Sequence, residues 1–452
     1  MKFHSTNYKS KDVDFKTAII QGQASDYGLY MLNKIPKLNN DTLESFKNME
    51  FIEMALIIIS KFIGDIISEG ILKKIINSAL NFKIPVEEIT NNDYVCYLDR
   101  GPTCSFKDFG ARMLARIMQH FLEIENKNLV ILTATSGDTG GAVAQAFYEM
   151  PRIKVVVLYP KDEISDLQRK QMTTLGKNVI AIGINGKFDN CQSLVKAAFA
   201  DKELKKINLS SANSINFGRL MPQTLYYFWS HSCITKKNGE EVIFSVPSGN
   251  FGNLTGGLIA EKMGLPVKIF ISAVNENDEF PIFLRTGMYK KVEPSKKCIS
   301  NAMNVGHPSN LARIIDLYGG QLDENGNIYK IPNMEKLRKD IISYSISDLV
   351  TKNTIVDFYE KEKRIIEPHG AVGWAALKSY RNDFPENNNV KSITFETAHP
   401  SKFPDEIISL IKITPEMPTS LQMIRDKKEF PNPMEVKNYQ DFKNFLLKEF
   451  SN

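Results

Sequence analysis

The sequence has little of what marks secreted, disulfide-rich or membrane proteins. Its five cysteines are scattered, odd in number and never spaced as CxxC, which argues against a disulfide framework and against a zinc site. The first residues lack the apolar core of a secretory signal. The densest apolar run, Met54 to Ile59, is far too short to span a bilayer. We therefore expect a cytoplasmic protein with no membrane segment and no bound metal.

The chain also lacks a strong excess of charge of either sign. Its 57 basic and 52 acidic residues leave a net charge of +5, and no basic block stands out, so binding to nucleic acid has little electrostatic support. A length of 452 residues with 42% hydrophobic residues is enough for two or three domains with a large buried core.

From residue 128 onward, short β-branched runs alternate with helical patterns, which is typical of parallel sheets covered by helices on both faces. The strand patterns lie at 129–132, 155–159, 179–182, 242–246 and 267–273, and the helical patterns at 142–150, 165–175, 191–199 and 254–263. The part before residue 91 is mainly helical by pattern, and 278–310 is predicted to be a long irregular segment.

These patterns predict an α/β protein with three parts. We expect a helical N-terminal portion at 1–95, a large α/β domain at 96–127 and 213–452, and a small α/β domain at 128–212. A crevice between two α/β units is where small ligands usually bind.

One lysine is a candidate for covalent chemistry. Lys107 stands in the frame Ser105-Phe106-Lys107-Asp108, at the beginning of an amphipathic helical pattern and so near the positive end of its dipole. That position and partial burial would lower the ammonium pKa and supply the neutral amine that reacts with an aldehyde cofactor. A solvated surface lysine is the alternative, and it is the commoner case for a single lysine taken alone.

A glycine-rich loop, Thr133 to Gly141, follows one strand pattern and opens a helix. Its glycines let backbone N–H groups converge, and Ser136 and Thr139 add hydroxyl donors, which suits a carboxylate or a phosphate. An ordinary helix N-cap is the alternative. The loop matches neither GxGxxG nor GxxxxGKS/T, which argues against dinucleotide-binding and P-loop sites.

A second loop of this kind, Ser248 to Asn253, follows another strand pattern. Its glycines again frame a nest of amides, and Phe251 can exclude water, although a tight strand-to-helix turn would have the same sequence. Two anion-binding loops and one candidate lysine together indicate pyridoxal-phosphate chemistry on an amino acid that carries a second anionic group.

Two further segments bring polar groups. Ser211 to Arg219 places amides and hydroxyls before an arginine that could bind phosphate in bidentate fashion, and a surface ion pair of Arg219 is an equally good explanation. Thr397 follows the strand-like run 393–395, where its hydroxyl could face a ligand or cap the next element. His399 is more typical of a structural histidine than of a catalyst.

Taken together, the motifs resemble those of the threonine synthase family, in its bacterial and fungal branch with a long N-terminal portion. The resemblance runs through nearly the whole chain, with the motifs in order and at compatible spacing. It is carried by Ser5-Thr6, Gln21-Gly22, 26–30, 62–65, 101–103, 106–110, 133–140, 211–216, 246–252, 300–303, 308–310, 367–369, 397–400 and Lys402-Phe403. Gly141, Met31 and Gly370 depart from the usual residues, but none of these changes removes a group with a chemical role.

The resemblance implies the tryptophan-synthase-β-like fold of pyridoxal-phosphate enzymes (fold type II), with pyridoxal 5'-phosphate held between a small and a large α/β domain. It implies that Lys107 is the catalytic residue and binds the cofactor aldehyde. It also implies that Thr397 faces the pyridine nitrogen, where a neutral hydroxyl would leave that nitrogen unprotonated. The other implied contacts are Asp138, Ser248, Gly249, Asn250, Phe251, Gly252 and Asn253 for the cofactor, Thr135, Ser136, Asp138 and Thr139 for the substrate carboxylate, and Ser214, Asn216 and Arg219 for the substrate phosphate.

The reaction implied by the resemblance converts O-phospho-L-homoserine and water to L-threonine and phosphate, in a monomer or homodimer. Three alternatives stay open: a phospholyase that releases 2-oxobutyrate, ammonia and phosphate, a serine or threonine dehydratase on the same fold, and a non-catalytic binding protein. The cluster around Arg219 favours a phosphorylated substrate over the dehydratase. The intact lysine and glycine loops argue against a binding protein.

Overall fold

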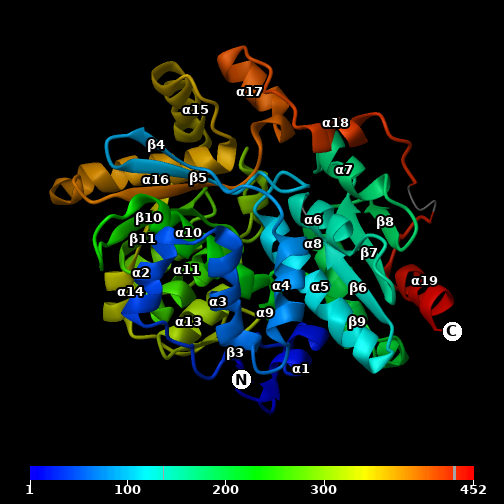
Figure 1. Ribbon diagram of the computed structural model, residues 1–452. Helices are drawn as coiled ribbons and strands as arrows, with labels where there is room; N and C mark the ends of the chain where they lie inside the picture. The colour runs from blue at the N-terminus through cyan, green and yellow to red at the C-terminus, as the bar shows by residue number, and fades with distance from the viewer. Residues whose placement is uncertain (136, 431–433, 452) are drawn as a thin grey trace.

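A six-stranded sheet forms the centre of the larger part of the molecule (Figure 1), in a computed structural model that describes residues 1–135, 137–430 and 434–451. Its strand order is β14-β11-β10-β15-β5-β4, and only the edge strand β4 runs antiparallel to its neighbour. The strands are β4 (Val86–Thr90), β5 (Asp93–Tyr97), β10 (Val242–Pro247), β11 (Val267–Val274), β14 (Ile341–Ser345) and β15 (Ser392–Glu396). Parallel neighbours bring the carboxyl ends of β10, β15 and β5 to one edge of the sheet.

A four-stranded parallel sheet of order β8-β7-β6-β9 forms the centre of the smaller part. Its elements are β6 (Leu129–Ala134), α6 (Asp138–Phe147), β7 (Ile153–Pro160), α7 (Asp166–Thr173), β8 (Val179–Ile184), α8 (Phe188–Ala200) and β9 (Leu209–Ser211). The strands predicted between residues 129 and 273 are all present, because most of their apolar residues are buried within a sheet covered by helices.

The N-terminal part is less helical than its sequence suggests. It contains α1 (Phe15–Gln21), α2 (Asn40–Ser45), α3 (Phe51–Ile63) and α4 (Glu69–Ala79), but also a small antiparallel sheet of β1 (Lys2–Ser5), β2 (Val13–Asp14) and β3 (Tyr30–Leu32). Strands of two to four residues are too short to show an alternating pattern. Strands β4 and β5 also fall within the range 1–95 predicted for this portion, yet both belong to the six-stranded sheet.

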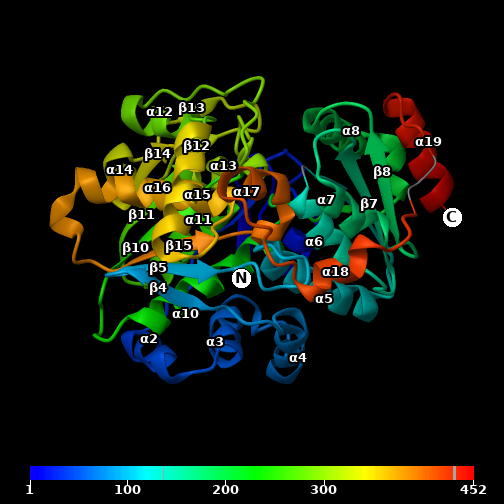
Figure 2. The same ribbon diagram turned by 90° about the horizontal axis from the view of Figure 1, so that it is seen from above.

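The C-terminal helix lies with the smaller part (Figures 1 and 2), whereas the sequence pattern predicts that residues 213–452 belong to the large domain. Helix α19 (Tyr439–Phe450) packs against α8. Its Phe442, Phe445 and Leu446 share one apolar cluster with β6, β7 and β8. Helix α18 (Thr419–Arg425) likewise contacts α7. The chain therefore returns to the small sheet after finishing the large one.

The segment predicted to be irregular at 278–310 begins with a helix, α12 (Glu279–Thr286). Phe280, Phe283 and Leu284 stand at helical spacing and are buried, and this apolar face stabilises the helix despite the loop-like composition around it. The remaining helices of the large part are α10 (Leu225–Ile234), α11 (Gly252–Met263), α13 (Leu311–Leu317), α14 (Met334–Asp340), α15 (Asp348–Glu362), α16 (Pro368–Asp383) and α17 (Pro404–Ile411).

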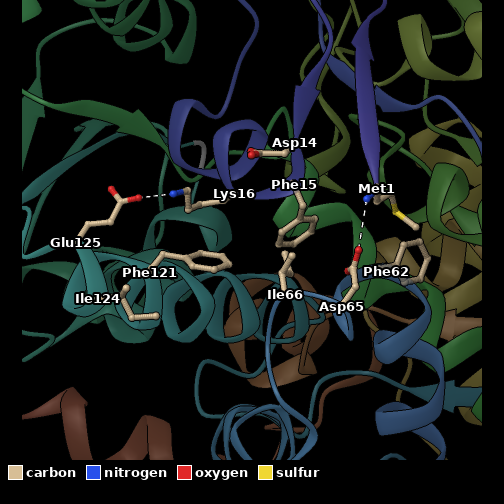
Figure 3. A pocket seen from close by; sticks show the side chains of 10 residues that line it. All are labelled: Met1, Asp14, Phe15, Lys16, Phe62, Asp65, Ile66, Phe121, Ile124 and Glu125. Atoms are coloured by element: carbon tan, nitrogen blue, oxygen red, sulfur yellow. Dashed lines mark hydrogen bonds and ion pairs between the residues drawn. The ribbon is translucent and has the colours of Figure 1, made fainter.

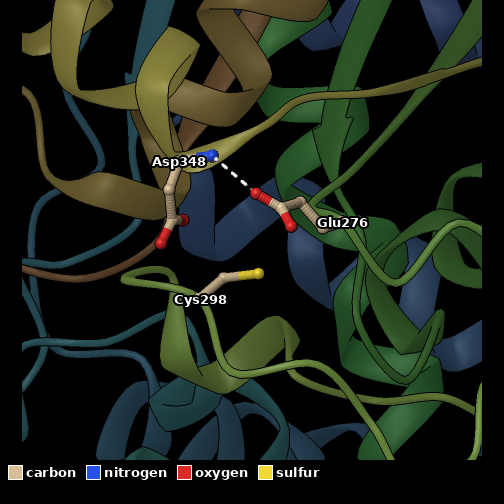
Figure 4. A group of neighbouring side chains, drawn as sticks. All are labelled: Glu276, Cys298 and Asp348. Carbon is tan, nitrogen blue, oxygen red and sulfur yellow. Dashed lines mark hydrogen bonds between the residues drawn. The ribbon is translucent and has the colours of Figure 1, made fainter.

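A group of three side chains fastens the loop after β11 to the start of α15 (Figure 4). Glu276 accepts a hydrogen bond from the backbone N–H of Asp348 at 3.2 Å, and the Asp348 carboxylate accepts one from the N–H of Ile299 at 3.1 Å. The Cys298 thiol lies beside both carboxylates.

Among the described residues, no helix is both long and apolar enough to cross a membrane.

Helix α5 (Lys107–Glu125) joins the two parts, since it contacts α6 in the smaller part and both α4 and α9 (Phe217–Leu220) outside it. At its C-terminal end lies a pocket of about 340 Å³ with an apolar floor that includes Phe15, Phe62 and Phe121 (Figure 3). An ion pair between Lys16 and Glu125 borders this pocket. The opposite end of α5 begins with Lys107, at a second and larger cavity.

Candidate active site

A cavity of about 560 Å³ opens where the carboxyl ends of strands from both sheets meet. Lys107 enters it from the start of α5, and Thr135 follows β6. Ser248 follows β10, and Thr397 follows β15. The carboxyl edge of parallel strands is the usual ligand site in open α/β sheets. The structure thus gathers four segments that are far apart in the sequence.

Lys107 is largely buried, with 14% of its side chain exposed, which rules out the solvated surface lysine. Its Nζ lies 3.9 Å from Oδ2 of Asp138. Burial lowers the pKa of Lys107 to about 8, and the negative charge of Asp138 opposes this shift, while the positive charges of Lys402 and Arg219 add to it. An amine with this pKa is a usable nucleophile and base near neutral pH.

Asp138 is held by a second lysine that the sequence reasoning gave no role. Nζ of Lys402, fully buried, lies 2.5 Å from Oδ1 of Asp138 and also donates to the backbone oxygen of Thr103 at 3.1 Å. Gln168 donates to the same carboxylate at 3.0 Å. Burial would raise the pKa of Asp138, but the two lysines outweigh it and hold that pKa well below its usual range. Asp138 is therefore ionised at neutral pH.

The loop after β6 is shaped by Thr135. Its Oγ1 accepts hydrogen bonds from the N–H groups of Gly137 at 2.9 Å and Gly140 at 2.7 Å. Gly137 has φ +135°, a conformation that other residues rarely adopt, so a glycine is needed there. Thr139 lines the cavity, and Ser136, predicted to bind the substrate carboxylate, lies outside the described residues.

The loop from Ser248 to Asn253, whose glycines predict an anion nest, has several donors without an acceptor. The described residues offer no acceptor to the backbone N–H groups of Gly249, Asn250 and Phe251, which precede the N-terminus of α11. The Asn253 Nδ2 is buried and also lacks an acceptor among these residues. Its Oδ1 lies 2.7 Å from the hydroxyl of Tyr227. Unsatisfied donors at a helix N-terminus suit a phosphate.

Arg219 is buried, with 4% exposed, and lines the cavity, so it is not a surface residue. Its Nη1 donates to the backbone oxygen of Ala212 at 2.6 Å, and no carboxylate of the described residues pairs with it. Burial lowers its pKa to about 10, so it stays charged at neutral pH. A buried guanidinium without a counter-ion is costly unless an anion binds there.

Of the two residues predicted to bind the substrate phosphate together with Arg219, one lines the cavity and the other does not. Ser214 lines the cavity, and its backbone oxygen is held by Arg313 at 3.2 Å. Asn216 is not part of the cavity wall: its Nδ2 donates to backbone oxygens of Ile19 and Ser211, and its Oδ1 caps α9 by accepting from Gly218. The Asn216 side chain has no free group for a phosphate and acts as a structural brace.

Thr397 lines the cavity, and its hydroxyl donates to Oε1 of Glu367 at 3.2 Å. Glu367 and its neighbour His369 are both buried. His399 does not line this cavity and instead caps a short turn by accepting from the N–H of Ser401, as expected of a structural histidine.

Sequence reasoning therefore missed two kinds of residue: buried charges that hold a predicted ligand in place, and residues that brace a predicted loop. They are Gln168, Asn310, Arg313, Glu367, His369 and Lys402. One signal was available, because Glu367 precedes a proline that begins a helical pattern, and such an acid is typical of an N-cap.

Comparison with known proteins decides the family. The model of the pyridoxal-phosphate dependent enzyme family matches residues 87–394, and models of the threonine synthase N terminus and C-terminal region match 2–80 and 370–446. Threonine synthase of Escherichia coli K12 is 37% identical over 422 residues, which cover 93% of this chain and 94% of that protein. The chain belongs to the threonine synthase family. A threonine synthase of Buchnera aphidicola (subspecies Acyrthosiphon pisum) is 40% identical with the same coverage.

Solved threonine synthase structures share the whole fold. The Escherichia coli crystal structure matches with a TM-score of 0.88 at 35% identity, over 99% of this chain and all of that one. Pyridoxal-phosphate-bound threonine synthase of Brucella melitensis matches with a TM-score of 0.90 at 29% identity, over 99% of this chain and 98% of that one. Maize serine racemase, at 16% identity and a TM-score of 0.51, shares the fold alone. The fold class predicted from the sequence is confirmed.

A threonine synthase is a lyase that uses pyridoxal phosphate, and the cavity fits this cofactor. Lys107 offers an amine of lowered pKa for its aldehyde, and the free N–H groups of Gly249, Asn250 and Phe251 together with Nδ2 of Asn253 offer donors for its phosphate. The donors lack acceptors within the described residues, and a phosphate would supply them.

Proposed function

We propose that the substrate is O-phospho-L-homoserine and that the enzyme converts it with water to L-threonine and phosphate. The observation that carries this proposal is the buried, unpaired guanidinium of Arg219 in a cavity that already holds a separate phosphate nest. Two anion sites in one cavity are what a phosphorylated substrate needs in addition to a phosphorylated cofactor. A dehydratase that acts on serine or threonine would have no group to pair with Arg219.

Lys107 is proposed to carry the proton transfers of the reaction. Pyridoxal phosphate, when bound, supplies the electron sink. With the cofactor and substrate bound, the amine of Lys107 would take the proton from Cα and later protonate another carbon. Its pKa of about 8 lets it both accept and donate protons near neutral pH. The neighbouring Asp138, held ionised by Lys402, keeps the lysine in the cavity.

The binding groups are proposed to orient the bond that breaks. The loop shaped by Thr135, with Thr139 on the cavity wall, would hold the substrate carboxylate. Arg219 and Ser214 would hold the substrate phosphate and stabilise the charge that develops as it leaves Cγ. A released phosphate kept there would lie close enough to Cβ to accept a proton from the attacking water, which favours threonine over the keto acid.

The products made by purified holoenzyme from O-phospho-L-homoserine test the proposal. We expect threonine and inorganic phosphate in equal amounts. A mixture dominated by 2-oxobutyrate, ammonia and phosphate would instead establish a phospholyase with the same cofactor and substrate. Turnover of unphosphorylated serine or threonine at a comparable rate would contradict the role of Arg219.

We also propose a cytoplasmic location and action as a monomer or homodimer. The five cysteines form no disulfide, and four of them are buried, which suits a reducing compartment.

A further inference from the structure

Arg313, on α13, joins that helix to two distant segments of the chain. Its side chain is fully buried. Its Nε donates to the backbone oxygen of Tyr30 at 3.0 Å, at the beginning of β3. Its Nη1 and Nη2 donate to the backbone oxygens of Ser214 at 3.2 Å and Ile215 at 2.6 Å, and Nη1 also donates to Oδ1 of Asn310 at 2.6 Å. The guanidinium is thus held between the small N-terminal sheet and the segment before α9.

Asn310 extends these contacts to the loop that follows β10. An asparagine at an N-cap usually caps its helix with its side chain, but Asn310, the N-cap of α13, makes no such hydrogen bond. Its Nδ2 instead donates to the backbone oxygens of Asn250 at 3.0 Å and Ser214 at 3.3 Å. Because an arginine side chain only donates, the amide oxygen of Asn310 faces Arg313 and its nitrogen faces the two carbonyls. The two side chains therefore form one unit.

The peptide groups held by this unit carry N–H groups on their other side. In a trans peptide the C=O and the N–H point in opposite directions. The peptide that joins Ser214 to Ile215 is trans, so holding its oxygen on the side of α13 turns the N–H of Ile215 away from that helix. The same holds for the oxygen of Asn250 and the N–H of Phe251. Ile215 and Phe251 line the cavity, and the described part of the chain offers neither N–H an acceptor.

Arg313 also strengthens the donor that it orients. Burial lowers the pKa of Arg313 to about 9, which leaves the guanidinium charged at neutral pH. A charged donor on a carbonyl oxygen polarises the whole peptide group, and the N–H at the other end becomes a better donor to an anion. An anion in the cavity therefore gains more from this N–H than from one that no charged group assists.

We propose that Arg313 and Asn310 form a positioning unit that serves both phosphate sites of the cavity. The unit aims the N–H of Ile215 at the substrate phosphate, which makes this N–H a further binding group of that site. It aims the N–H of Phe251 at the cofactor phosphate. The inference rests on the proposed function, which places the substrate phosphate beside Arg219. Its consequence is that one substitution, at a residue that touches neither phosphate, weakens the binding of both.

The two affinities can be measured separately and without turnover. Titration calorimetry of the holoenzyme with inorganic phosphate measures the substrate site, because the cofactor occupies the other one. Reconstitution of the apoenzyme with pyridoxal phosphate, followed by absorbance, measures the cofactor site. Arg313→Lys keeps a positive charge, but an ammonium group cannot reach all the oxygens that the guanidinium fork holds. Losing a well-aimed hydrogen bond to an anion weakens binding by about 10-fold or more, so we expect a loss of this size in both titrations.

Arg112→Lys is a matched control. Arg112 is also a buried arginine on a helix and donates to the backbone oxygens of Ala79 at 2.6 Å and Ser78 at 2.9 Å, but these two residues are not part of the cavity wall. Its replacement should leave both affinities unchanged even where it lowers stability. If Arg313→Lys does not fold, Asn310→Ala, which removes the amide donor of the unit, is judged by the same two titrations. An unchanged affinity in either titration, or an equal loss in Arg112→Lys, would overturn the inference.

Arg219→Ala separates the inference from the proposed function. It should weaken phosphate binding by the holoenzyme with little change in cofactor affinity. If it does so while Arg313→Lys leaves the phosphate affinity unchanged, the substrate site stands and the inference fails. If Arg219→Ala leaves the phosphate affinity unchanged, the proposed substrate site and the inference fall together. Loss of both affinities in Arg313→Lys, in an enzyme that makes 2-oxobutyrate and ammonia, would keep the inference and reject threonine as the product.

Discussion

Replacing Lys402 by methionine should destabilise the folded enzyme more than any change to a surface lysine. Lys402 is fully buried, and its ammonium group lies 2.5 Å from the equally buried carboxylate of Asp138. Methionine fills most of the volume of the lysine stem, so packing is largely conserved. What the change removes is the positive charge, and Asp138 is left with Lys107 at 3.9 Å and the amide of Gln168.

The size of the effect follows from the burial of the pair. Breaking a buried ion pair by removing one partner costs about 3–5 kcal/mol, because the other charge stays buried without compensation. Lys107 remains close enough to Asp138 to compensate part of its negative charge. We therefore expect a loss of about 3 kcal/mol, the low end of the range. Lys74→Met, at an exposed position of α4, is the control and should change the free energy of unfolding by less than about 0.5 kcal/mol.

The loss should depend on pH in a defined direction. The pKa of Asp138 is depressed in the folded enzyme, so its pairing contributes stability above the ordinary pKa of 3.8, and this contribution is lost as the pH falls below that value. In Lys402→Met the pKa of Asp138 rises, because only Lys107 and Gln168 then oppose the effect of burial. The deficit should therefore be largest at neutral pH and shrink as the pH falls and Asp138 takes up a proton.

Urea unfolding of both variants and the unmodified enzyme, with and without cofactor, measures these differences. Combining Lys402→Met with Asp138→Asn should restore part of the lost stability, since the double variant no longer buries the carboxylate that Lys402 balances. A deficit in Lys402→Met no larger than in Lys74→Met would refute the reasoning. So would a deficit that does not change with pH.

Further predictions concern the cavity itself. Borohydride treatment of the holoenzyme should fix the cofactor on the peptide containing Lys107, and Lys107→Ala should lose both this label and turnover; a label elsewhere would contradict the assignment. Cofactor uptake by the apoenzyme should accelerate with pH around about 8, since Lys107 becomes neutral above that value, and a midpoint near the ordinary 10.5 would contradict the burial argument. Arg219→Ala should lower kcat/KM by about 30- to 1,000-fold, or about 2–4 kcal/mol, with little loss of cofactor, whereas the reverse pattern would mean that the two phosphate sites are exchanged. Asn216→Ala should lower stability by about 1–3 kcal/mol because its amide braces the backbone, and a change confined to the substrate KM would contradict that role.

The fold was predictable where single segments carry a clear physical signature. Strands such as 129–134 and 242–247 are continuous apolar runs because helices cover both faces of their sheets. The small N-terminal sheet was not predictable, because its strands are stabilised by pairing between distant segments rather than by their own pattern. The packing of α19 against the small sheet was not predictable for a similar reason. Its apolar face indicates that the helix is buried, but it does not indicate which part of the protein covers it.

The site was predictable as far as local sequence determines chemistry. Lys107 at a helix start and the glycine-framed loop at 248–253 can be recognised in the sequence, because each of these features is built from adjacent residues. Arg219 was ambiguous between a surface pair and a ligand, and only its burial without a carboxylate partner resolves it. The phosphate role of Asn216 is implied by the family resemblance, and the hydrogen bond to Ile19, 197 residues away, that gives it a structural role leaves no trace in the local sequence.

The most direct test of the account is to find which product takes up an oxygen atom from water. The enzyme is incubated with O-phospho-L-homoserine in water enriched in oxygen-18, and the products are analysed by mass spectrometry. The account predicts threonine as the dominant product, with one labelled oxygen on its β-hydroxyl and unlabelled phosphate, because water adds at Cβ while the Cγ–O bond breaks. Dominant 2-oxobutyrate with ammonia, or label in the phosphate instead of the threonine hydroxyl, would contradict it.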